Sequence, residues 1–223
     1  MDGFDEDLKY AYWDGTAWRI QTVDSAGKIA WDTSLALDSD DYPHIAYYDW
    51  IPDYDLKCAS WDGAAWRIQT VDTEGDVGRS ASLELDSNDY PRISYCKRSG
   101  SKPDDLKYAY WDGSAWRVET VDAEGDLGSF TSLELDSSGY PHISYSDYSK
   151  YHDIDLKYAR WDGSAWRVET VDYLGCLGSH TSLALDASEY PHIAYFRFYW
   201  DFGFLKYASW DGDHWRFLYI DNP

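Results

Sequence analysis

One hairpin-like motif recurs five times along the 223-residue chain and constrains the fold more than any other feature. One copy reads LKYAYWDGSAW, from Leu106 to Trp116. The leucines that open the five copies stand at positions 8, 56, 106, 156 and 205, which gives steps of 48, 50, 50 and 49 residues. A repeat of this length is typical of propellers and solenoids.

A second motif lies between successive copies of the first and occurs four times, for example as SLELDSSGYPHISYSD from Ser132. Together the two motifs predict a unit of four short strands, with turns at LDSxxYP and at Asp-Gly. Large Leu, Ile and Tyr side chains alternate with small Ala and Ser along the strands, so each sheet has a bulky face and a smaller one. We expect the bulky face of one unit to pack on the small face of the next.

These units predict an all-β protein, a single β-propeller domain over residues 1–223 with four-stranded antiparallel blades. The sequence has five blade positions, of which one is incomplete, an isolated outer hairpin at 8–24. The four complete blades are expected at 31–72, 79–122, 129–172 and 179–221. An unpaired sheet edge at the incomplete blade would favour a homo-oligomer. A linear solenoid is the alternative, but it more often uses shorter units.

The YAYWDGSAW hairpin resembles the Asp-box of BNR and sialidase-like propellers, in which an Asp, a Gly and a Trp close the turn between the third and fourth strands. The whole unit is also similar to repeats of uncharacterised bacterial and archaeal propeller proteins. Here the step from Asp112 to Trp116 is four residues, one shorter than in the usual Asp-box. The resemblance implies a structural role for the turn aspartates Asp14, Asp62, Asp112, Asp162 and Asp211. Related propellers include lectins, glycosidases and scaffolds, so the fold alone selects no function.

The charge and the cysteines exclude several classes of function. A net charge of −22 argues against nucleic acid and against anionic membranes as partners. No apolar run approaches the ~20 residues of a membrane span, and the first residues lack the features of a signal peptide. The compartment stays open, with an extracellular location expected if the chain is a mature or trimmed form. Cys58, Cys96 and Cys176 stand where other copies carry other residues, so we interpret them as substitutions rather than a disulfide or metal framework.

The two rims of the expected ring differ in how much they vary between copies. The LDSxxYP and WDGxxW turns barely change, whereas the loops at 48–55, 96–105, 146–155 and 196–204 and the segments leading into the first strands change almost everywhere. Binding residues concentrate on variable loops held by a rigid frame. The candidate ligand-binding residues on this variable rim are Trp31, Trp50, Tyr54, Arg98, Phe130, Tyr148, Tyr151, His180, Arg197, Tyr199 and Trp200. Each aromatic side chain taken alone is best explained as packing over the edge of a blade. The set as a whole indicates recognition of a sugar or a protein.

Features of an enzyme are weaker. A sialidase-like site needs converging arginines, but the five arginines of strand four would be spread around the outer wall; they are Arg19, Arg67, Arg117, Arg167 and Arg216. Glu84 and Glu134 replace alanines of the first strand and could form a central acid pair for a glycosidase or a lyase. Acids lining a wet channel are the simpler interpretation.

No metal or cofactor is indicated. His44, His142 and His192 share one position with Arg92, which suggests a structural role, and no histidine pair has zinc spacing. Aspartate-rich loops such as YHDID are compatible with calcium but lack the spacing of a calcium loop. The sequence therefore predicts a non-enzymatic propeller with lectin-like carbohydrate recognition on the variable rim. A protein–protein interaction scaffold is the alternative, and a glycosidase or lyase with a central acid pair is the third hypothesis.

Overall fold

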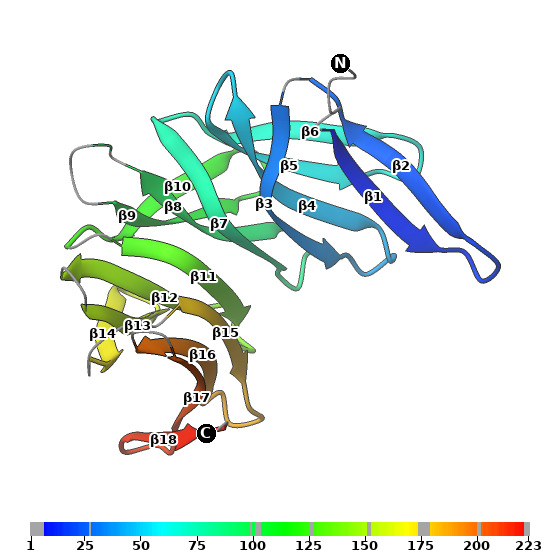
Figure 1. The fold of residues 1–223 in the computed structure, drawn as a ribbon. Helices are drawn as coiled ribbons and strands as arrows, with labels where there is room; N and C mark the ends of the chain where they lie inside the picture. The colour runs from blue at the N-terminus through cyan, green and yellow to red at the C-terminus, as the bar shows by residue number, and fades with distance from the viewer. Residues whose placement is uncertain are drawn as a thin grey trace.

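The computed structural model describes residues 7–26, 28–98, 100, 104–124, 127–150, 153–173, 179–199 and 202–220. These residues contain no helix and form five antiparallel sheets (Figure 1). Sheet I has two strands, β1 (Leu8–Trp13) and β2 (Trp18–Asp24). Sheet II has the four strands β3 (Lys28–Leu37), β4 (Pro43–Ile51), β5 (Asp55–Trp61) and β6 (Trp66–Asp72). Sheet III has the four strands β7 (Asp76–Leu85), β8 (Pro91–Arg98), β9 (Asp105–Trp111) and β10 (Trp116–Asp122). Sheet IV has the four strands β11 (Leu127–Leu135), β12 (Pro141–Lys150), β13 (Asp153–Trp161) and β14 (Trp166–Asp172). Sheet V has the four strands β15 (Ser179–Leu185), β16 (Pro191–Tyr199), β17 (Phe202–Trp210) and β18 (Trp215–Tyr219).

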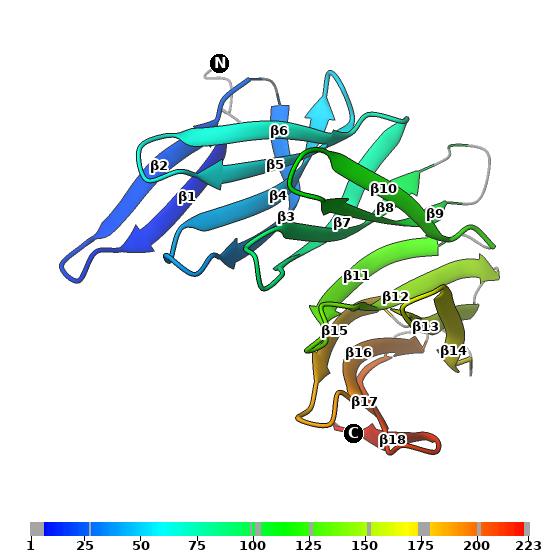
Figure 2. The same ribbon diagram turned by 180° about the vertical axis from the view of Figure 1, so that it is seen from behind.

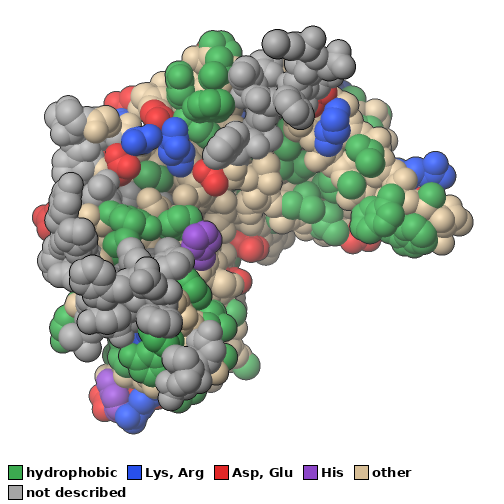
Figure 3. Space-filling model, viewed as in Figure 1, with side chains coloured by type: hydrophobic (Ala, Val, Ile, Leu, Met, Phe, Trp, Pro, Cys, Tyr) green, Lys and Arg blue, Asp and Glu red, His purple; other side chains and the backbone are tan. Residues whose placement is uncertain are grey.

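The sheets follow one another along an open arc, like the blades of a propeller that does not close. Figures 1 and 2 show sheet I at one end of the arc and sheet V at the other. The first strands of successive four-stranded sheets, β3, β7, β11 and β15, contact one another directly along the inside of the arc. The space-filling view shows the same open shape, with hydrophobic side chains on the surface of the projecting end formed by β1 and β2 (Figure 3).

The Leu/Ile side of each sheet packs on the opposite side of the preceding sheet, which carries large side chains as well as the small ones that the alternation in the sequence predicts. On sheet IV, Leu133 and Ile143 lie opposite each other on one face and are almost completely buried. They pack in one cluster with Leu106 and Tyr108 of sheet III, beside its buried Ser94. We call the Leu/Ile side of each sheet its leucine face and the opposite side its serine face. This stacking removes apolar surface from water at every junction.

Two polar contacts repeat across the junctions. A serine of one first strand accepts a hydrogen bond from a leucine N–H of the next, over 2.9–3.0 Å; the pairs are Ser34–Leu83, Ser82–Leu133 and Ser132–Leu183. A buried tyrosine of each second strand donates to the aspartate that ends the preceding sheet, over 2.6–2.7 Å; the pairs are Tyr47–Asp24, Tyr95–Asp72, Tyr145–Asp122 and Tyr195–Asp172. These contacts fix the stagger between sheets, because each buried donor finds its acceptor in one register only.

The aspartates of the WDGxxW turns close those turns, which agrees with a structural role. Asp162 Oδ1 accepts hydrogen bonds from the N–H groups of Ser164 and Ala165, and its Oδ2 pairs with Arg167 Nε at 2.5 Å. The other four turns repeat this arrangement around Asp14, Asp62, Asp112 and Asp211. The five strand-four arginines therefore serve their own turns and do not converge.

Each first strand contains one residue with a left-handed backbone, at the position where its pairing register shifts. These residues are Asp32, Ser80, Phe130 and His180, with φ of 53–55°. A non-glycine residue seldom adopts this conformation, and such bulges redirect side chains. The four positions carry different residues and lie on the rim that varies between copies.

The remaining sequence features are placed as follows. Cys58 and Cys96 are buried free thiols, and Cys176 lies outside the described residues. No helix in the described part of the chain is long and apolar enough to cross a membrane.

Candidate functional site

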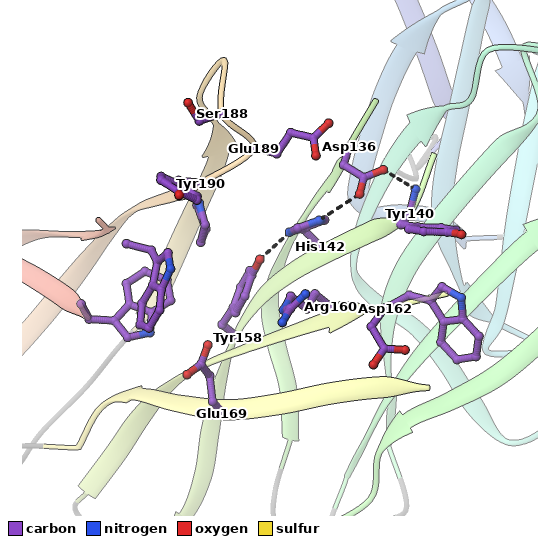
Figure 4. Close-up of a pocket in the computed structure, with 14 residues that line it drawn as sticks. Asp136, Tyr140, His142, Tyr158, Arg160, Asp162, Glu169, Ser188, Glu189 and Tyr190 are labelled. Atoms are coloured by element: carbon purple, nitrogen blue, oxygen red, sulfur yellow. Dashed lines mark hydrogen bonds and ion pairs between the residues drawn. The ribbon is translucent and has the colours of Figure 1, made fainter. Parts of the chain in front are cut away.

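The junction between sheets IV and V contains a cavity of about 410 Å³, which we call the junction pocket (Figure 4). It opens on the rim of the LDSxxYP and WDGxxW turns, the one that changes least between copies. Its aromatic lining consists of Tyr140, Tyr158, Trp161, Tyr190, Trp210 and Trp215. Its polar lining includes Asp136, His142, Arg160, Asp162, Glu169 and Glu189. Flat apolar surfaces beside a few polar groups are typical of small-molecule sites.

The junction pocket has a buried donor without a partner. Trp215 Nε1 is buried and has no hydrogen-bond partner among the described residues. At the III/IV junction the equivalent Trp166 Nε1 donates to Glu119 Oε2 at 3.2 Å, and at the I/II junction Trp66 Nε1 donates to Gln21 at 3.2 Å. Glu169 takes the place of Glu119 in the repeat but does not bond Trp215. Trp116 Nε1 at the II/III junction is likewise buried without a partner among the described residues, and Gln69 stands at the acceptor position there. Of these two junctions, IV/V is the one where a carboxylate, Glu169, stands at that position, so an acid and an indole N–H are both left for another partner.

Arg160 adds a cation to the pocket, whereas the arginine at the III/IV junction, Arg92, pairs with Asp86. The same position of the repeat carries Tyr12, Ser60 or Tyr110 at the other three junctions. Arg160 is exposed near the end of β13, and no ion pair is found for it within the described residues (Figure 4). Guanidinium groups can donate several hydrogen bonds in one plane, so Arg160 can bind adjacent oxygen atoms of a ligand.

A row of three polar side chains forms another wall of the pocket. Figure 4 shows His142 between Asp136 and Tyr158; His142 Nε2 is 3.6 Å from Asp136 Oδ2, and its Nδ1 is hydrogen-bonded to the Tyr158 hydroxyl. Burial lowers the pKa of His142 and raises that of Tyr158. The same row occurs on sheet V as Asp186, His192 and Tyr207, which agrees with a structural role for this histidine position. The described residues contain no group of three or more His, Cys, Asp or Glu able to hold a metal.

Glu189, another acid of the pocket, has a structural role. Glu189 Oε1 accepts hydrogen bonds from the backbone N–H of Ser137, at 3.1 Å, and from the Ser137 hydroxyl. Asp89 makes the same contact to Ser39 at the II/III junction. Glu189 therefore joins two neighbouring turns and is less available to a ligand than Glu169.

A second cavity, of about 390 Å³, lies on the variable rim between sheets III and IV. It brings together three of the residues predicted from sequence, Arg98, Phe130 and Tyr148. A fourth, His180, stacks on Phe130 with ring centroids 4.1 Å apart. Arg79 also lines it, but this side chain pairs with Asp76 at 3.1 Å and lies over the Tyr48 ring.

The other predicted site residues do not join this group. Trp50 and Tyr54 lie on sheet II and in the turn after β4, and neither lines the variable-rim cavity. Tyr151 and Trp200 lie outside the described residues, as do the side chains of Trp31, Arg197 and Tyr199. The set of eleven thus remains a prediction, with four members clustered.

Both glutamates of the inner strands have a raised pKa. Burial, with the Glu134 carboxylate as a second cause, raises the pKa of Glu84 to about 7. Burial also raises the pKa of Glu134. The pair has the perturbed ionisation that acid catalysts share, although buried structural acids show it too.

Comparisons with known proteins bear on the fold. No family model matches the chain, and no curated protein matches it. Among solved structures, a protein of unknown function from Dyadobacter fermentans superposes with a TM-score of 0.65 and 12% identity, over 93% of this chain and 70% of the other. A lectin from Aleuria aurantia, in complex with α-methyl-L-fucoside, gives 0.60 and 14%, over 99% and 72%. An ulvan lyase gives 0.64 and 13%, over 94% and 60%. The chain therefore has the fold of propellers that include lectins and carbohydrate-active enzymes.

Sequence reasoning missed the junction pocket. The repeated turns that surround it were assigned wholly to the scaffold, because they hardly change between copies. The available signal was the single change to Arg160 at a position where the other copies carry Tyr or Ser.

Proposed function

We propose that this chain is a non-enzymatic, lectin-like propeller that binds carbohydrate in the junction pocket. The observation that carries the proposal is the pairing that is missing there: Trp215 Nε1 is buried without a partner among the described residues, as Trp116 Nε1 is at II/III, but here the carboxylate of Glu169 and the guanidinium of Arg160 line the same cavity. A sugar hydroxyl both donates and accepts, so it can satisfy the indole and the carboxylate together. The aromatic walls offer the flat apolar surfaces on which a sugar ring packs.

Two further points support carbohydrate over other ligands. The pocket carries several acids and one arginine, and the chain is strongly acidic, which favours a neutral ligand over an anionic one. Structural neighbours include a lectin in complex with a methyl fucoside. We also propose that the chain fills five blade positions and that its WDGxxW turns are Asp-box-like.

The test is a glycan array, run with and without calcium, on the chain and on two matched arginine variants. Arg160→Tyr installs the residue that two other junctions carry, so the fold should be kept. Arg98→Ala removes an exposed arginine of the variable-rim cavity. Glycan binding lost in the first variant and kept in the second supports the junction pocket, and the opposite result places the sugar on the variable rim.

A protein-binding scaffold is the alternative, and the observation that favours it is the cavity at Arg98, Phe130 and Tyr148. Its residues do not repeat from blade to blade, unlike the residues of a multivalent lectin. A silent glycan array would move the proposal to this surface, with the chain then used to capture protein partners and Phe130→Ala as the matched negative.

The third candidate is a glycosidase or lyase, favoured by the raised pKa of Glu84 beside Glu134. Incubation with polysaccharides, followed by detection of reducing ends and of unsaturated products, tests it directly. Activity lost in Glu84→Gln would overturn the non-enzymatic proposal.

A further inference from the structure

The inner half of sheet II lacks the cover that every other first strand receives. Leu35 of β3 is 52% exposed, whereas the equivalent Leu83, Leu133 and Leu183 are 2%, 2% and 4% exposed. In those three cases the serine face of the preceding sheet lies over the leucine. Sheet I, which precedes β3, consists only of the outer pair β1 and β2. The exposure of Leu35 is thus explained by two strands that the neighbouring sheet does not have.

The hydrogen bonds that accompany this cover are also missing. Leu83, Leu133 and Leu183 donate their N–H groups to a serine of the preceding first strand. Leu35 has no such serine among the described residues. Thr131 and Thr181 likewise bond across their junctions, whereas the equivalent Thr33 is exposed.

The edge of β1 that faces away from β2 has no neighbouring strand among the described residues. In the complete sheets the equivalent third strand pairs with a second strand along this edge. The lysine of that strand is buried there, with side-chain exposures of 14%, 13% and 6% for Lys57, Lys157 and Lys206, but Lys9 of β1 is 47% exposed. Lys57 pairs with Asp49 and Lys157 lies 3.6 Å from Asp147, both at the end of a second strand.

We propose that this open edge and the Leu35 face form one docking surface for a two-stranded hairpin of the repeat's own inner type. The occupant would present Ser-Leu-x-Leu on its first strand and Pro-His-Ile-x-Tyr-x-Asp on its second. The complete sheets specify how it pairs: Ile143 lies opposite Ala159, Ser144 opposite Tyr158 and Tyr145 opposite Lys157. An equivalent hairpin on β1 therefore sets these residue types opposite Ala11, Tyr10 and Lys9.

The three covered junctions argue for this occupant over a generic apolar partner. Its serine would accept the Leu35 N–H, its small face would cover Leu35 and Leu37, and its final aspartate would meet Lys9. Its histidine would reach Tyr10, as His142 reaches Tyr158. The Leu35 N–H, the exposed Leu35 and Leu37 and the open edge of β1 all find counterparts in a single segment, which an unrelated apolar peptide would not supply. Its aspartate would add to the ion pair that Lys9 already makes with Asp7. Strand addition to an open edge is an established mode of peptide recognition.

The test uses the whole chain and a labelled synthetic peptide with the sequence of residues 132–147, SLELDSSGYPHISYSD. Fluorescence anisotropy at physiological salt should show saturable binding, and a scrambled peptide should show none. Hydrogen exchange should slow at the Leu35 amide and along β1 when the peptide is added. Absence of saturable binding, or protection elsewhere in the chain, would overturn the proposal.

Matched variants keep the result specific. Leu35→Asp should weaken peptide binding at least tenfold, and Lys9→Glu should weaken it by a smaller factor. Leu218→Asp, at a leucine 58% exposed on the last strand, should leave the affinity unchanged. Equal binding by Leu35→Asp and the unaltered chain contradicts the proposal. A dimer of the chain alone that Leu35→Asp dissociates would also contradict it, because a second copy would then occupy the surface.

Discussion

The III/IV and IV/V junctions share their scaffold and differ in how their polar groups are used. Both have the same turns and the same stack of leucine face on serine face. At III/IV the indole of Trp166 and the carboxylate of Glu119 satisfy each other, whereas at IV/V Trp215 and Glu169 do not. The difference shows that the hydrogen bonding at a junction can change through a few side chains while the backbone is kept.

The largest effect should come from removing the acceptor at IV/V. Glu169→Ala should weaken sugar binding by about 10- to 100-fold, because hydrogen bonds to charged groups contribute roughly 1.5–3 kcal/mol. Titration calorimetry with a glycan found on the array measures this. Thermal unfolding should change little, since Glu169 is exposed. An unchanged affinity would exclude Glu169 as a ligand-binding residue.

The matched change at III/IV should have the opposite profile. Glu119→Ala should lower the free energy of unfolding by about 1–2 kcal/mol, because it leaves the Trp166 N–H buried without a partner. Urea unfolding monitored by tryptophan fluorescence checks this, with Glu169→Ala as the control. Equal loss of stability in both variants would remove the distinction between the two junctions.

The turn aspartates on the rims of both junctions should behave alike. Hydrogen bonds from Ser114 and Ala115 hold the pKa of Asp112 below its usual range, and equivalent hydrogen bonds lower the pKa of Asp162. A depressed carboxylate pKa adds stability above the usual pKa of Asp, and this stability is lost as the pH falls. Asp112→Ala and Asp162→Ala should each lower the urea midpoint at neutral pH, with the difference from the unaltered chain shrinking in acid. A variant that keeps its full deficit at low pH would contradict this account.

The last effect concerns the inner strand of sheet III. The pKa of Glu84 rises from 4.5 to about 7 on folding, so the folded chain holds the extra proton between these values. Stability should therefore fall as the pH rises through this window. Glu84→Gln should flatten that part of the profile of urea midpoint against pH, and Glu74→Gln, at an exposed side chain, should leave it unchanged. An unaltered slope in Glu84→Gln would show that another group titrates there.

Much of the architecture could be predicted from the sequence. Period-two alternation and the Asp-Gly turns indicated the hairpins, and the pairing of bulky with small faces followed from Leu133 and Ile143 against Ser82 and Ser94. Side-chain contacts between neighbouring repeats were beyond that reasoning, because nothing in the PHISY and ETVD motifs indicates that Tyr145 donates a hydrogen bond to Asp122. The junction pocket was missed for the same reason, since its residues come from two repeats. The Phe130–His180 stack depends on a left-handed bulge that no turn residue in the sequence signals.

The serine-to-leucine bonds link each first strand only to its immediate neighbours. The arc therefore behaves as a linear chain of coupled units, in which the free energy of one sheet depends on the sheets beside it and hardly on those further away. Insertion or loss of a whole unit changes one such link and leaves the rest intact. The chemistry of a single junction can thus diverge without a cost that spreads to the other blades.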